Sequence, residues 1–262
     1  MNIRAGGFLL QGLISIPFLE AVEETDELEF EETVLNGLAG FYWIIRIKHG
    51  REFALRKLMM FINRFHKPIK AMGREFNLKN KYQRKLDRDY CASWTVTDHV
   101  CSWQEIETII KDIEDTPLSN VLVEVIDIAN KKVSSLKGNT HYLLKSSVAF
   151  PGLFPPLEGN YLSSIYYSQI PLYGIKNADL VLVNLRNTEM LPVKNANQIL
   201  VQSLELRSGE LARKILHEVS PSQISSNKQV NTNNLSAFIN TLDTMKEKFK
   251  VQLNKTHFQK TK

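Results

Sequence analysis

The most constraining feature of the sequence is an apolar, proline-rich stretch at residues 146–171. It contains the motif Pro151-Gly152-Leu153-Phe154-Pro155-Pro156, or PGLFPP. Proline fixes φ and has no backbone N–H, so neither a helix nor a central strand can run through this motif. The apolar residues predict a packed loop, and such loops often border functional sites. Two interpretations follow: a loop that only covers the core, or a loop that frames a site.

The residues around this motif resemble the patatin-like phospholipases. In that family a helix ends in Ala-Ser and is followed by Pro-Gly-x-Phe-Pro-Pro, a tyrosine, an Asp-Gly-Gly turn and Asn-x-Pro. Here Lys145-Ser146-Ser147 precedes PGLFPP, and Tyr161 and Gln169-Ile170-Pro171 follow it in register. The Asp-Gly-Gly turn aligns with Ser163-Ser164-Ile165. Ser163 therefore stands where the resemblance implies the catalytic aspartate.

The position of the expected nucleophile is also changed. Residues 34–45 predict a strand, a sharp turn and an apolar helix, which is the arrangement of a nucleophile elbow with the motif Gly-x-Ser-x-Gly. The family pattern is Gly-Thr-Ser-Ala-Gly, but the sequence has Asn36 at the first glycine and Leu38 at the serine. Leucine has no lone pair, so covalent catalysis of this type cannot start at Leu38.

The third element of the family site lies near the N-terminus, where residues 2–24 predict a strand, a glycine turn and a helix. The resemblance aligns residues 7–12 with a glycine-rich loop whose amides form the oxyanion hole. Only Gly7 and Gly12 remain of its glycines, and its arginine is absent. Phe8 and Leu9 restrict the backbone conformations that direct amides at an oxyanion. We expect a turn rebuilt for packing.

The resemblance covers roughly residues 2–218 and implies a three-layer α/β/α sandwich with a central, mostly parallel sheet. A chain of 262 residues is long enough for one sizeable core. We expect a patatin-like domain at 1–219 with a basic helical insertion at about 48–90, a polar linker at 220–234, and a C-terminal amphipathic helix with a basic tail at 235–262. The last helix is predicted either to pack on the body or to act as an interaction arm.

The basic stretch at residues 48–88 contains thirteen Lys or Arg and three acidic residues, with aromatic residues between them. One interpretation is a pair of amphipathic helices with a solvated basic face. The other is a docking surface for anionic lipid head groups. The contacts expected for that surface are Arg56, Lys57, Arg64 and Lys67. No recognised nucleic-acid-reading motif accompanies the charge, so we expect no specific nucleic-acid partner.

The remaining patterns argue against other chemistry. Cys91 and Cys101 lie ten residues apart and the six histidines are scattered, so we expect neither a metal site nor a cofactor. The acidic run at residues 20–32 is interpreted as the solvated end of the first helix and a surface loop, with partner binding as the alternative. No cleavage site follows the apolar N-terminal segment, and no apolar run approaches about 20 residues. We expect a cytoplasmic protein, with peripheral membrane association as an option.

The changes at Leu38, at Ser163 and in the loop from Gly7 to Gly12 together predict a patatin-like protein without the Ser-Asp dyad. Such a pseudoenzyme would have a lipid-binding or partner-binding role. Its partner would be an anionic membrane surface, an acyl lipid, an active family relative or a second copy of the chain. The alternative is an active lipid acyl hydrolase with a displaced nucleophile. The serines considered for that role are Ser15, Ser163, Ser164 and Ser168.

Overall fold

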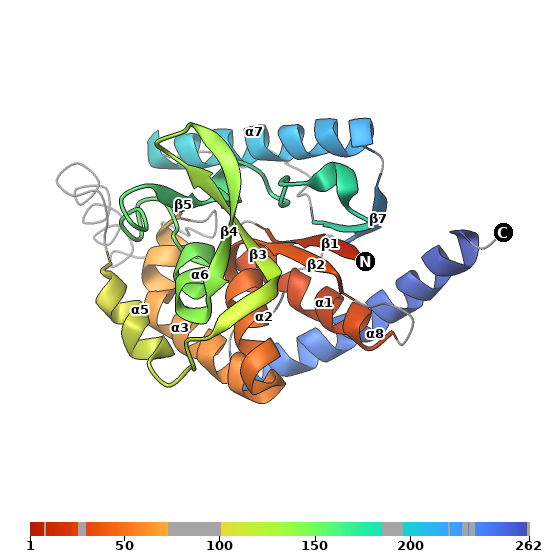
Figure 1. The fold of residues 1–262 in the computed structure, drawn as a ribbon, viewed down its shortest axis with the longest axis horizontal. Helices are drawn as coiled ribbons and strands as arrows, with labels where there is room; N and C mark the ends of the chain where they lie inside the picture. Colours follow the sequence, from red (N-terminus) through yellow and green to blue (C-terminus); the bar gives the residue numbers. More distant parts are fainter. Residues whose placement is uncertain are drawn as a thin grey trace.

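The strands form one central sheet in the computed structural model (Figure 1). The structure describes residues 1–7, 9–25, 30–72, 101–184, 196–219, 221–226, 230 and 234–260. Its strands are β1 (Asn2–Ala5), β2 (Glu32–Leu35), β3 (Pro117–Asp127), β4 (Lys132–Asn139), β5 (Tyr161–Ser163), β6 (Leu180–Val183) and β7 (Ser222–Ser225). The expected α/β class with a mostly parallel sheet is confirmed.

The order of the strands is β4-β3-β2-β1-β6-β7, and β5 pairs with β3. The pairs β1–β2, β1–β6, β2–β3 and β6–β7 are parallel, whereas β4 and β5 run antiparallel to β3. All four residues of β6 are buried, as is typical of a parallel strand that is covered on both faces. β3 and β4 form an antiparallel hairpin, joined by a turn at 128–131.

One face of the sheet packs against most of the helices. These are α1 (Ser15–Glu23), α2 (Gly37–His49), α3 (Arg51–Met72), α5 (Trp103–Ile110), α6 (Thr140–Ser147) and α8 (Leu235–Lys260). The main hydrophobic core lies on this side and includes Ile3, Leu35 and Val123 of the sheet. The helix α5 begins with a Ser102–Glu105 capping box and buries Ile106, Ile109 and Ile110 on one face.

The opposite face is covered by α7 (Ala196–Val219), which lies above the sheet in Figure 1. A smaller apolar cluster joins Val181 and Val183 of β6 to Ala212 and Leu216 of α7. Helices therefore lie on both faces, which is consistent with an α/β sandwich. Among the described residues, none of the helices combines the length and the apolar character needed to cross a bilayer.

The C-terminal helix α8 packs on the body of the protein. It buries Phe238, Leu242, Met245, Phe249 and Leu253. The ring of Phe249 contacts that of Phe18 in α1 edge to face, with 5.8 Å between the ring centroids. Of the two arrangements predicted for this helix, the structure therefore has the packed one.

The segment at 220–234, which the sequence predicts as a polar linker, contributes the edge strand β7. Ile224 is its apolar residue and is 3% exposed. β7 pairs in parallel with β6, which supplies hydrogen-bond partners for part of the backbone of β7. A single isoleucine among polar residues is too weak a pattern to predict a strand, because pairing with a distant β6 supplies most of the stabilisation.

Candidate functional site

Three segments that the sequence singles out meet at the carboxyl ends of β1 and β2. The amide of Gly7, just after β1, donates to Oδ1 of Asn36, just after β2, at 3.1 Å. Nδ2 of Asn36 donates to Oγ of Ser164, just after β5, at 2.9 Å. The carboxyl edge of a parallel sheet is where α/β proteins usually bind ligands. The fold thus brings the glycine turn, the elbow-like turn and the serine pair together.

Asn36 occupies the N-cap position of α2, but its side chain does not cap the helix. The carboxamide instead crosses from β2 to the glycine turn. A Cβ atom on Gly6 would lie 1.9 Å from Oδ1 of Asn36, so this arrangement requires glycine at position 6. Gly37 begins α2 with φ of 62°, and the space beside it is filled by Gly7 O and the side chain of Ile165. The predicted strand-turn-helix forms, and its turn is closely packed.

Leu38 lies in the first turn of α2 with no exposed surface and belongs to the main hydrophobic core. The position that the resemblance assigns to a nucleophile is therefore a packing position. The loop after β1 continues into a 3-10 helix at Leu9–Ile14, in line with the expected rebuilt turn. Gly12 lies against the backbone of Gly7, where an added Cβ would be 2.8 Å from Gly7 O. Phe8 lies outside the described residues.

Ser163 is fully buried, and its Oγ has no hydrogen-bond partner among the described residues. Its amide donates to Ala149 O at 2.8 Å, which joins β5 to the proline-rich loop. That loop is packed as expected: Phe150, Leu153 and Phe154 have no exposed surface. Phe154 stacks on Trp103, with 5.0 Å between the ring centroids. The loop covers the core and, through Ser163, also borders the site.

Sequence reasoning missed a buried carboxyl beside this site. Glu124 of β3 has no exposed surface, and its Oε2 accepts hydrogen bonds from the amides of Leu172 and Tyr173. Burial raises the pKa of Glu124 to about 7, although the Ser164 hydroxyl, the two amides and Arg4 act in the opposite direction. The available signal was Glu124 itself, one of two carboxylates in the otherwise apolar run VLVEVIDI.

The described part of the basic stretch is largely paired within the protein. Lys57 is 6% exposed, and its Nζ donates to Ile109 O at 2.7 Å and to Asp112. Arg64 pairs with Glu105 of α5 at 2.7 Å. Of the four cations expected to contact lipid, Lys57 therefore does not face solvent and Arg64 is shared with an acidic partner.

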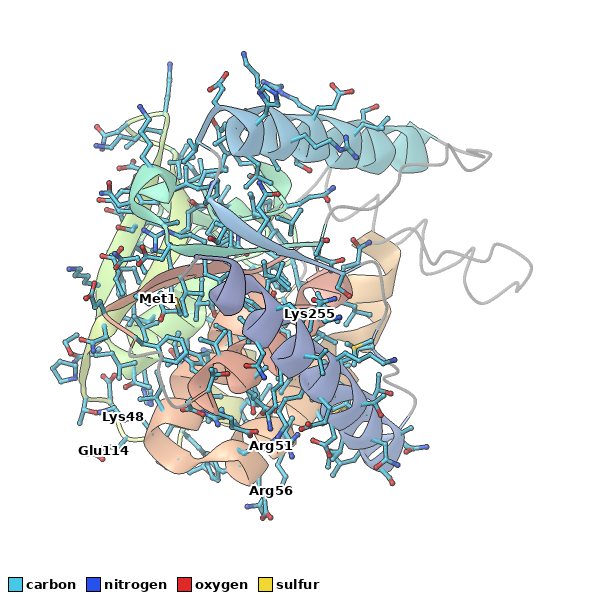
Figure 2. The ribbon with its side chains drawn as sticks, turned by 90° about the vertical axis from the view of Figure 1, so that its right-hand side faces the viewer. Met1, Lys48, Arg51, Arg56, Glu114 and Lys255 are labelled. Carbon is cyan, nitrogen blue, oxygen red and sulfur yellow. The ribbon has the colours of Figure 1, made fainter. Side chains whose placement is uncertain are left out.

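Arg56 is exposed on α3 and has no ion pair among the described residues; its guanidinium lies 6.0 Å from the ring centroid of Phe53. Figure 2 places it toward the same end of the molecule as exposed Lys48. The side chain of Lys67 lies outside the described residues. The described part of the basic stretch at residues 48–88 therefore presents fewer unpaired cations to solvent than the sequence predicts.

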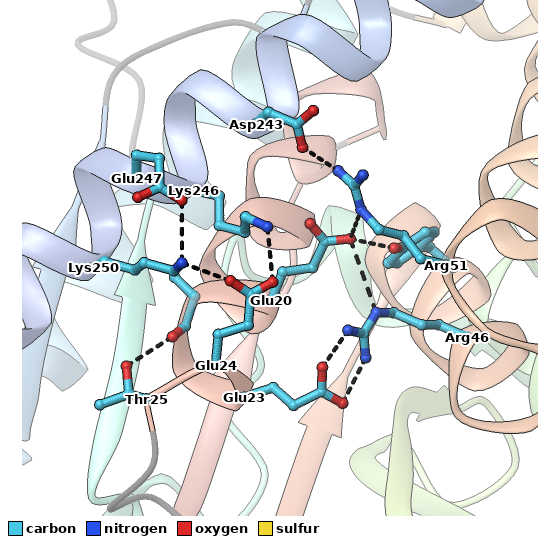
Figure 3. A network of polar contacts seen from close by, with 12 residues as sticks. Glu20, Glu23, Glu24, Thr25, Arg46, Arg51, Asp243, Lys246, Glu247 and Lys250 are labelled. Carbon is cyan, nitrogen blue, oxygen red and sulfur yellow. Dashed lines mark hydrogen bonds and ion pairs between the residues drawn. The ribbon is translucent and has the colours of Figure 1, made fainter.

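The acidic run is the solvated helix end that the sequence predicts only in part: Glu23, Glu24 and Glu31 are exposed, but the run also holds a buried carboxylate and a set of ion pairs. Glu20 is fully buried, where Tyr42 donates to its Oε1 and Arg51 pairs with it at 2.9 Å. Glu24 pairs with Lys246 at 2.7 Å and with Lys250 at 2.6 Å (Figure 3). The interpretation missed these contacts because the partners come from α2, α3 and α8, which lie far along the chain. Residues 26–29 lie outside the described residues.

The described residues contain no cluster of three or more His, Cys, Asp or Glu that could hold a metal ion. Cys101 is a buried free thiol whose pKa is raised to about 12 by burial, with a smaller contribution from Glu105, so its thiolate is disfavoured at neutral pH. Cys91 is not among the described residues. Comparison with models of known protein families and with curated proteins gave no match.

Proposed function

We propose that this chain is a catalytically inactive protein of the patatin-like phospholipase fold, which acts by binding a lipid or a protein partner. The observation that carries the proposal is the buried chain of hydrogen bonds from Gly7 through Asn36 to Ser164, beside Leu38. Gly7 and Leu38 stand at the positions that the resemblance assigns to the oxyanion loop and the nucleophile, and Ser164 directly follows Ser163, the position assigned to the base. Their meeting at the carboxyl edge of a mostly parallel sheet supports the resemblance.

The chemistry of these positions favours a non-catalytic role. The Gly7 amide is already bonded to Asn36, so it does not point at an incoming oxyanion. Leu38 has no nucleophilic atom, and Ser163 has no carboxylate. A reacting ester must come within about 3–3.5 Å of a nucleophile. Asn36, Leu38, Ser163 and Ser164 have no exposed surface at all, so the site is closed as well as altered.

One observation favours a second candidate, a lipid acyl hydrolase with Ser164 as displaced nucleophile. The Ser164 hydroxyl faces Glu124, a carboxyl whose pKa is raised to about 7, near the value that suits a general base. Both residues are fully buried, and Ser164 also accepts a hydrogen bond from Asn36. Hydrolysis would therefore require an opening of the site that binding alone does not require.

A vesicle cosedimentation experiment tests the lipid-binding role. The protein is mixed with vesicles of phosphatidylcholine alone or with added phosphatidylserine, at low and high salt. We expect preferential binding to the anionic vesicles, lost at high salt because exposed charges are screened. Replacing Arg56 and Lys67 by glutamate should weaken binding, since each cation near such a surface contributes about 1 kcal/mol.

The matched control replaces Lys176 and Lys214 by glutamate. Both are exposed, and Lys214 lies on α7, on the other face of the sheet. This pair changes net charge by the same amount and should leave vesicle binding intact. Equal binding to both vesicle types, or equal loss in the two double variants, would contradict a lipid-docking surface on α3 and leave a protein partner as the binding role.

A further inference from the structure

Two buried side chains of opposite charge hold the segment at residues 171–174 against the sheet. Glu124 of β3 accepts hydrogen bonds from the amides of Leu172 and Tyr173, the latter at 2.5 Å. Arg4 of β1 donates from Nε to Tyr173 O at 2.9 Å and from Nη2 to Gly174 O at 3.1 Å. Four backbone groups of three successive residues are thus bound by two side chains.

The second half of this segment, Tyr173 and Gly174, buries little apolar surface of its own. Ile170 and Ile175 are buried on either side of the segment. Between them, Pro171 is buried and Leu172 is half-buried against the smaller apolar cluster, whereas Tyr173 and Gly174 are exposed, the tyrosine to 41%. Segments with few buried apolar groups open locally at low free-energy cost. The polar contacts to Glu124 and Arg4 are therefore what holds Tyr173 and Gly174 against the sheet.

The closed segment is a poor environment for an ionised Glu124. Its side chain has no contact with solvent, and Oε1 has no hydrogen-bond partner among the described residues. A buried carboxylate without a full set of donors is strongly disfavoured relative to the neutral acid. Besides the two amides, the Ser164 hydroxyl faces Glu124.

The neighbouring charges compensate Glu124 only in part. Among the described residues Arg4 is the charged side chain that acts on it, but the hydrogen bonds of Arg4 go to backbone carbonyls and to Glu32, at 3.0 Å. Glu32 of β2 and Asp179, which precedes β6, also attract this guanidinium. Ser135 of β4, opposite Glu124, adds no charge. The shift of the Glu124 pKa to about 7 agrees with this geometry.

We propose that residues 171–174 form a pH-sensitive strap, which lies on the sheet while Glu124 is protonated and is released when Glu124 ionises. The closed form binds the proton more tightly than an open form in which Glu124 meets water. The contribution of Glu124 to closure is therefore fully present below about pH 4.5 and is lost as pH rises through about 7. Release exposes Glu124 and the adjacent Ser164, at the end of the hydrogen-bonded chain from Gly7.

Hydrogen–deuterium exchange of the full chain tests the strap. Exchange of peptides that cover residues 170–175 is followed from pH 5.5 to 8.5 and corrected for the intrinsic pH dependence of amide exchange. The pKa of Glu124 is about 7 in the closed form and has an ordinary value of 4.5. Linkage between these two values predicts that protection of residues 170–175 falls about 30-fold from pH 5.5 to 8.5. Peptides from α6, which are not bound to Glu124, serve as the internal control.

Two variants identify the titrating group. Glu124→Gln keeps an oxygen for the two amides but cannot ionise, so it should remove the pH dependence of strap protection. Asp127→Asn changes another carboxyl of β3, which accepts hydrogen bonds from Asn130 that lower its pKa, and should leave the dependence unchanged. Constant protection in the wild-type protein, or the same pH dependence in Glu124→Gln, would overturn the proposal. If Glu124→Gln does not fold, the comparison between strap and α6 peptides in the wild-type protein still tests whether the strap loses protection as pH rises.

Discussion

Replacing Leu38 by serine restores the nucleophile of the family pattern, and we expect it to destabilise the protein without creating a hydrolase. Leu38 has no exposed surface and lies in the main core. Truncating a buried leucine costs about 2–5 kcal/mol. A hydroxyl left without a partner there adds about 1–3 kcal/mol. The expected loss is therefore about 5 kcal/mol, a large part of the 5–15 kcal/mol that stabilises a typical domain.

Urea unfolding followed by tryptophan fluorescence measures this loss. Leu38→Ala forms the same cavity without a hydroxyl, so its difference from Leu38→Ser isolates the cost of the polar group. Leu38→Met conserves volume and should cost less than about 1.5 kcal/mol. A free energy of unfolding within 1 kcal/mol of wild type for Leu38→Ser would refute the reasoning, because it would show that position 38 can hold a solvated hydroxyl.

Two further substitutions test the packing around the site. Ser163→Ala should leave the free energy of unfolding unchanged or raise it, because the hydroxyl that it removes is buried without a described partner; a loss above about 1 kcal/mol in urea unfolding would reveal a missed hydrogen bond. Phe249→Ala should lower the free energy of unfolding by about 3–5 kcal/mol, since the ring is 3% exposed and packs on Phe18. Val251→Ala, at an exposed site of α8, is its control. If Phe249→Ala and Val251→Ala lowered the free energy of unfolding by the same small amount, the packing of α8 on α1 would be contradicted.

The elements that could be predicted from the sequence are those with local patterns. The prolines of PGLFPP predict a packed loop, and residues 34–45 predict a strand, a turn and a helix, in each case through neighbouring residues. The meeting of Asn36 with Ser164 could also be anticipated, because the resemblance aligns their segments with parts of one site. No pattern within either segment alone predicts the contact between them.

The features that were missed depend on partners far along the chain. Glu20 is buried because Tyr42 and Arg51 surround it, and Arg51 also reaches Asp243 of α8. Lys57 does not contribute to an exposed basic face because it pairs with Asp112, which lies 55 residues later in the chain. Counting charges along the chain treats each as solvated. The fold instead joins acidic and basic runs to each other, and such pairing is visible only in three dimensions.

The most direct test of the central claim is labelling of the purified protein with a fluorophosphonate probe, which reacts with activated serines. We predict no labelling of the wild-type protein above that of heat-denatured protein, and no hydrolysis of short acyl esters, while an active serine hydrolase in the same assay is labelled. Robust labelling that is lost in Ser164→Ala and in Glu124→Gln, with both variants folded, would contradict the account, because it would show that the buried serine beside Glu124 is an active nucleophile.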